Sequence, residues 1–201
     1  MARLLLLRHA PTAETGTVLT GRTAGVPLHE EGAAIAGAVA ERLAGTEVRA
    51  VYTSPVLRCR QTAQAVADVH GLDPIRVRGL EEVDYGSWAG RRLKDLARLK
   101  RWEELFVAPS RVRFPDGETL KEVQDRAVAA VEAIAADHPK DTVVLVSHGD
   151  VIKAILAHYL GSPLDLFQRL HVSTASVSVI DVPTKGAPAV HAVNRILHGT
   201  S

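Results

Sequence analysis

The chain has 201 residues, of which 46% are hydrophobic and 23% charged, with a formal net charge of +1. This length and composition are ordinary for a globular protein of about one domain, and they argue against a disordered, collagenous or repeat protein. A nearly neutral chain has no overall field to attract nucleic acid or an anionic membrane, so we expect neither as a partner. The single cysteine, Cys59, permits no intrachain disulfide and no cysteine-based zinc site. The apolar run near the start, residues 4–7, is too short for a signal peptide or a membrane helix, and we expect a cytoplasmic protein.

Predicted strands and helices alternate along the chain. Continuous apolar or β-branched runs predict strands at residues 4–7, 48–52, 75–77 and 143–146. Apolar residues at helical spacing predict helices from Glu30 to the stop at Gly45, from about Pro55 to His70, from about Thr119 to Ile134, and from Val151 to Leu160. Residues 176–179 and 190–197 are expected to close the chain as a hairpin. This order predicts a three-layer α/β sandwich, with a mostly parallel central sheet and helices on both faces.

Residues 86–113 differ from the rest of the chain. They contain both tryptophans and many charged residues, and they favour a short helical insertion with one or two helices between Leu93 and Phe106. The basic side chains at 91–101 are expected to lie mainly on a solvated helix face. We expect the whole chain, 1–201, to be a single domain with this insertion.

The residues that follow the predicted strands carry the chemistry. In a parallel sheet the site lies beyond the carboxyl ends of the strands. Arg8 and His9 follow the first strand, Arg58 lies one turn into the helix after the second, Glu82 follows the third, and His148 follows the fourth. Arginine binds phosphate oxygens, a neutral histidine can attack phosphorus, and a carboxylic acid can protonate a leaving alkoxide. The inventory indicates phosphoryl transfer through a phosphohistidine, with no metal and no cofactor.

Six segments in chain order resemble the signature of a known family. They are Leu7-Arg8-His9-Ala10; Thr20-Gly21 with Pro27-Leu28 and Gly32; Tyr52-Thr53-Ser54-Pro55 with Arg58 and Thr62; Leu80-Glu81-Glu82 with Tyr85-Gly86 and Gly90; Phe114-Pro115-Asp116-Gly117-Glu118; and Val146-Ser147-His148-Gly149. Together they resemble the histidine phosphatase superfamily, in the branch that contains the cofactor-dependent phosphoglycerate mutases. The resemblance covers residues 4–150.

The resemblance implies a role for each matching residue. His9 would be the nucleophile, and Arg8 and Arg58 would hold the transferring phosphoryl group. His148 would donate to one of its oxygens, and Glu82, chosen over Glu81 by its spacing to Tyr85-Gly86, would protonate the leaving oxygen. Further substrate or phosphate contacts are expected from Thr15, Thr20, Gly21, Arg22, Tyr85 and Gly149. Arg22 stands where many relatives carry tryptophan and would add a charge at the mouth of the site.

Several functions fit this inventory. We favour a phosphatase that hydrolyses phosphorylated small molecules, because the insertion is short and the C-terminus is expected to end soon after the last strand. A phosphoglycerate mutase or phosphomutase would use the same site. A non-catalytic module that binds phosphorylated ligands is a weaker alternative, and a metal-dependent hydrolase is weaker still, because no carboxylates and histidines cluster at ligand spacing. The other seven histidines are expected on the surface or in packing, and a homodimer is expected only by analogy with the family.

Overall fold

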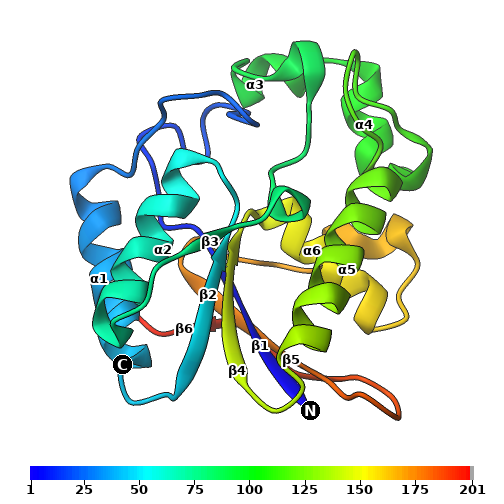
Figure 1. Cartoon of the computed structure of the whole chain (residues 1–201). Helices are drawn as coiled ribbons and strands as arrows, with labels where there is room; N and C mark the ends of the chain where they lie inside the picture. Colours follow the sequence, from blue (N-terminus) through cyan, green and yellow to red (C-terminus); the bar gives the residue numbers. More distant parts are fainter. Residues whose placement is uncertain (200–201) are drawn as a thin grey trace.

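A six-stranded sheet forms the centre of the computed structural model, which describes residues 1–199 (Figure 1). The strands are β1 (Ala2–Arg8), β2 (Val48–Thr53), β3 (Ile75–Arg76), β4 (Thr142–Ser147), β5 (Ser176–Val182) and β6 (Ala189–Ile196). Their order across the sheet is β3-β2-β4-β1-β5-β6. Strands β1 to β4 run parallel to one another. Strand β5 pairs antiparallel with β1, and β6 pairs antiparallel with β5 in the expected hairpin. The mostly parallel sheet predicted from the sequence is therefore confirmed.

Helices cover both faces of the sheet (Figure 1). On one face lie α1 (Glu30–Leu43) and α2 (Leu57–His70), and on the other α5 (Leu120–Asp137) and α6 (Gly149–Tyr159). Successive side chains of a strand point to opposite faces, so Leu5 and Leu7 pack toward α1 and α2, while Leu4 and Leu6 pack toward α5 and α6. All four leucines are buried. This central position of β1 explains its uninterrupted apolar run.

The insertion lies beyond the carboxyl ends of the strands (Figure 1). It contains two short helices, α3 (Leu93–Leu96) and α4 (Lys100–Val107), where the sequence predicted one or two. Trp88 is buried and packs against the rings of Trp102 and Phe114, with centroids 5.9 and 5.7 Å apart. Trp88 belongs to the core cluster that contains residues of α5 and α6, and Trp102 packs against that cluster, so both tryptophans join the insertion to the body of the protein.

The predicted start of α2 was wrong. The helix begins at Leu57, and Pro55 lies before it, because Val56 keeps an extended backbone as the N-cap residue. The N–H of Val56 donates to Oγ of Ser54 at 3.3 Å. At α5 the expected cap is present: Thr119 and Glu122 bond each other's backbone N–H groups, as in a capping box.

No helix within residues 1–199 is both long and apolar enough to cross a membrane.

Candidate active site

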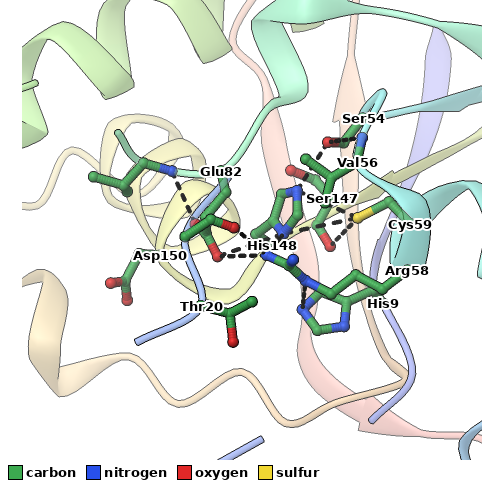
Figure 2. Close-up of polar contacts among 12 residues, drawn as sticks. His9, Thr20, Ser54, Val56, Arg58, Cys59, Glu82, Ser147, His148 and Asp150 are labelled. Carbon is green, nitrogen blue, oxygen red and sulfur yellow. Dashed lines mark hydrogen bonds and ion pairs between the residues drawn. The ribbon is translucent and has the colours of Figure 1, made fainter. Parts of the chain in front are cut away.

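A cavity of about 280 Å³ lies beyond the carboxyl end of β1. Four of the five expected catalytic residues line it: Arg8, His9, Arg58 and Glu82. They come from the end of β1, the first turn of α2 and the loop after β3, segments that are far apart in the sequence (Figure 2). The topology thus brings them together at one edge of the sheet, as the sequence predicted.

His9 is held in one orientation by its neighbours. Its Nδ1 lies 2.8 Å from the carbonyl oxygen of Ala10. A carbonyl only accepts hydrogen bonds, so Nδ1 carries the proton and Nε2 keeps its lone pair. Burial, followed by the charges of Arg58 and Arg8, lowers the pKa of His9 well below 6.5. The side chain is therefore a neutral imidazole with Nε2 as its nucleophilic atom.

Two guanidinium groups line the same cavity as His9. Arg58 donates from Nε to His9 Nε2 at 3.2 Å and from Nη2 to the carbonyl of Gly21 at 2.9 Å. Arg8 donates from Nη1 to the carbonyl of Val172 at 2.6 Å. Among the described residues, Arg8 Nε and Arg58 Nη1 are buried and have no acceptor. Buried donors of this kind are suited to the oxygens of a phosphoryl group.

Glu82 stands next to Arg58. Its Oε1 accepts from the N–H of Val83 at 3.0 Å, and its Oε2 lies 3.6 Å from Arg58 Nη2. Burial raises the pKa of Glu82 to about 7; the charge of Arg58 opposes this rise, and the charge of Asp150 adds to it. A carboxyl group with this pKa can both give and take a proton near neutral pH.

His148 does not line the cavity. It is fully buried behind Arg58 and Glu82, and its ring centroid is 5.3 Å from that of His9 (Figure 2). Its Nδ1 lies 3.0 Å from Arg58 Nη2 and 3.4 Å from Glu82 Oε2. Burial, with the charge of Arg58 as the next cause, lowers the pKa of His148 well below 6.5. The structure thus brings the two histidines close together, but His148 touches the arginine and the acid instead of open space.

The six further contact residues divide into two groups. Thr15, Thr20, Gly21, Tyr85 and Gly149 line the cavity. Arg22 does not, and the expectation of a charge at the mouth is corrected. Its Nε donates to the carbonyl of Glu82 at 2.8 Å and its Nη2 to Oε2 of Glu118 at 2.9 Å. These acceptors turn the guanidinium away from the cavity and toward the loop that carries Glu82.

Sequence reasoning missed part of the cavity wall. Asp150, Lys153 and His171 line it, although His171 was among the histidines assigned to the surface or to packing. Tyr85 donates to Oδ2 of Asp150 at 2.9 Å, and Lys153 lies 3.2 Å from Oδ1. Asp150 and Lys153 could have been found from their place in the first two turns of a helix that begins at the site. Nothing in the local sequence marks His171.

No group of three or more histidine, cysteine, aspartate or glutamate side chains within residues 1–199 is arranged to hold a metal ion. Cys59 is buried beside His148, with Sγ 3.4 Å from Nε2, and burial strongly raises the pKa of its thiol. A thiol held in this protonated state is a poor nucleophile. The nucleophile that the cavity offers is therefore His9.

Comparison with known proteins agrees with this geometry. Residues 4–195 match the histidine phosphatase superfamily (branch 1). The chain is 31% identical over 188 residues to phosphoserine phosphatase 1 of Hydrogenobacter thermophilus, covering 90% of this chain and 86% of that protein. It is 30% identical over 183 residues to a probable phosphoglycerate mutase, GpmB, of Cronobacter sakazakii, covering 90% and 85%. The solved structure of Bacillus stearothermophilus YhfR has a TM-score of 0.88 at 28% identity and covers 98% of each chain.

The chain belongs to the histidine phosphatase superfamily, branch 1. It is an enzyme that acts on phosphate esters.

Proposed function

We propose that this enzyme hydrolyses phosphomonoesters of small molecules through a phosphohistidine at His9, without a metal ion. The observation that carries the proposal is the environment of His9 Nε2. It is an unprotonated ring nitrogen at a cavity, 3.2 Å from Nε of Arg58, and the two arginines that line the same cavity each have a buried N–H group without an acceptor. A nucleophile and a phosphate-binding pair of arginines therefore meet at one point.

In the first step, the Nε2 lone pair forms a bond to phosphorus and the bond from phosphorus to the ester oxygen breaks. Arg8 and Arg58 bind the phosphoryl oxygens and stabilise their charge in the transition state. Glu82, protonated below about pH 7, gives its proton to the leaving oxygen. His148 acts through its contacts with Arg58 and Glu82, keeping both side chains in place.

In the second step, the Glu82 carboxylate takes a proton from water as the water oxygen attacks phosphorus. The phosphorus–nitrogen bond breaks, inorganic phosphate forms, and both His9 and Glu82 return to their starting states. A mutase would use a second substrate hydroxyl in place of this water. The relative named as a mutase keeps that alternative open, and the acceptor distinguishes the two activities.

The proposal is tested with a panel of phosphomonoesters assayed for phosphate release, with and without excess chelator. Wild-type enzyme should be unaffected by the chelator. His9→Ala should lose at least about a thousandfold in turnover, because the nucleophilic route is removed. His158→Ala, which changes an exposed histidine on α6, is the control and should keep full activity. A fully active His9→Ala protein would refute the mechanism.

The remaining expectations belong with this proposal. The chain acts in the cytoplasm as a single domain with the insertion at 86–113, and it takes neither nucleic acid nor membrane as a partner. Its sole cysteine, which is buried, supports a reducing compartment. A homodimer is proposed from the family resemblance alone, and size-exclusion chromatography with light scattering tests it.

A further inference from the structure

The loop that carries Glu82 is fixed by side chains from outside it. The carbonyls of residues 79, 80, 81 and 82 each accept a hydrogen bond from a side chain. Arg126 Nη1 donates to Gly79 at 2.9 Å and to Glu81 at 2.8 Å, and Ser147 Oγ donates to Leu80 at 2.8 Å. The loop has no strand partner at these positions, so these bonds replace a sheet ladder.

The carbonyl of Glu82 itself is held twice. Arg22 Nε donates to it at 2.8 Å and Arg126 Nη2 at 3.0 Å. The backbone of the expected general acid therefore rests between two guanidinium groups, and neither of them lines the cavity.

Arg126 uses its full hydrogen-bonding capacity here. Besides the three carbonyls, it donates from Nε to Oε1 of Glu118 at 2.9 Å and from Nη2 to Oε2 at 3.0 Å. Five bonds match the five N–H groups of an arginine in their fixed planar fork. A lysine at this position would keep the charge but could not reach all of these acceptors from one nitrogen.

Glu118 joins the two arginines. Its Oε2 also accepts from Arg22 Nη2 at 2.9 Å and from the N–H of Asp84 at 3.0 Å. Burial would raise the pKa of Glu118, but the hydrogen bonds from Arg126 and Asp84 and the charges of both arginines lower it. The carboxylate thus stays charged and balances part of the positive charge placed under the loop.

From this geometry we infer that Arg126, Glu118 and Arg22 form a clamp that positions Glu82 for proton transfer. The clamp is defined as these three side chains, and the inference rests on the proposed role of Glu82 as general acid. None of the three touches the reacting atoms, so they are positioning residues. Proton transfer depends on short distances, and a displacement of about 1 Å costs roughly a hundredfold in rate.

The test compares two substrates. An alkyl phosphate needs a proton on its leaving oxygen, whereas p-nitrophenyl phosphate needs little protonation. Arg126→Lys and Glu118→Gln should each lower kcat on the alkyl ester by about 10- to 100-fold and affect the nitrophenyl ester much less. Arg113→Lys is the matched control. Arg113 binds Glu122 and the carbonyl of Gly117 in the same region, but it has no hydrogen bond to the loop that carries Glu82. The activity of the Arg113→Lys variant should therefore equal that of the wild type.

The decisive arm places Arg126→Lys in a Glu82→Gln background. A clamp that acts through Glu82 has nothing further to lose there, so the double variant should match Glu82→Gln on the alkyl ester. If the clamp has a purely structural role, Arg126→Lys should lower kcat on both esters alike and should lower it further in the Glu82→Gln background. That result would overturn the inference. If Glu82→Gln alone does not lose more activity on the alkyl ester than on the nitrophenyl ester, the proposed general acid is wrong. If Glu82→Gln shows this selective loss and Arg126→Lys does not, only the clamp is wrong. Thermal melting of each variant identifies losses that come from unfolding.

Discussion

Arg58 donates a hydrogen bond from Nε to Nε2 of His9 at 3.2 Å, so the arginine expected to bind the phosphoryl group contacts the expected nucleophile directly. The contact keeps Nε2 as an acceptor, and with burial the positive charge holds the imidazole neutral. The same arginine reaches His148 and Glu82 through Nη2, which connects the four side chains (Figure 2).

Glu82→Gln should reduce activity according to the leaving group. The loss should be about a hundred- to ten-thousandfold on an alkyl phosphate, because the proton donor is removed, and much smaller on p-nitrophenyl phosphate. In the wild type, the alkyl reaction should slow above about pH 7, as Glu82 loses its proton. Steady-state rates from pH 5 to 9 measure both effects. If Glu81→Gln shows the selective loss and Glu82→Gln does not, the wrong carboxylate has been assigned.

The raised pKa of Glu82 also predicts a pH dependence of stability. The folded state holds this proton up to about pH 7, whereas the unfolded chain releases it near 4.5, so stability is lost as pH rises between these values. The expected loss at pH 8 is on the order of 3 kcal/mol. Urea unfolding of wild type and Glu82→Gln at several pH values isolates this contribution. The free-energy difference should shift in favour of the variant as pH rises; a constant difference would contradict the assignment.

Gly149→Ala should disturb Arg8. A Cβ at Gly149 would lie 3.2 Å from both Cζ and Nε of the Arg8 guanidinium, so that group must move by a few tenths of an ångström. Because Arg8 is expected to bind the phosphoryl group with every substrate, turnover should fall by roughly tenfold on alkyl and nitrophenyl esters alike. Gly37→Ala is the control, since its Cβ would meet no atom within 4 Å apart from its chain neighbours and the backbone of its own helix. It should leave activity unchanged and stabilise α1 by about 0.5–1 kcal/mol. Unchanged turnover in Gly149→Ala would show that Arg8 has room to adjust.

Phosphate release should exceed isomerisation. A mutase must shield its phosphohistidine from water, which requires a cover over the site. The insertion offers only the short helices α3 and α4 for this purpose. Enzyme mixed with 3-phosphoglycerate and a trace of 2,3-bisphosphoglycerate is followed for 2-phosphoglycerate and free phosphate, alongside a panel of monoesters. Rapid isomerisation with negligible phosphate release from any ester would make the protein a mutase.

The sequence predicted those parts of the fold that depend on local pattern. The run Leu4–Leu7 marked a strand buried on both faces, and the residues that end β1 and β4 were correctly placed at one edge. The ring centroids of His9 and His148 lie 5.3 Å apart because these strands are adjacent and parallel.

What the sequence could not predict was the direction of side chains whose partners are distant in the chain. Arg22 turns to Glu118, 96 residues later, instead of into the cavity. Similarly, His171 reaches the cavity wall from the segment before β5, where no motif marks it. The start of α2 was missed for a local reason, since Val56 keeps an extended backbone.

The central claim is tested most directly by trapping the intermediate. Enzyme is mixed with a phosphorylated substrate labelled with ³²P, quenched within milliseconds, and digested for mass spectrometry under alkaline conditions. We predict one phosphoryl group, stable to base and labile to acid, on Nε2 of His9, absent from His9→Ala and present in His158→Ala. A catalytically active wild-type enzyme that carries no label on His9, or carries the label on another residue, would contradict the phosphohistidine mechanism.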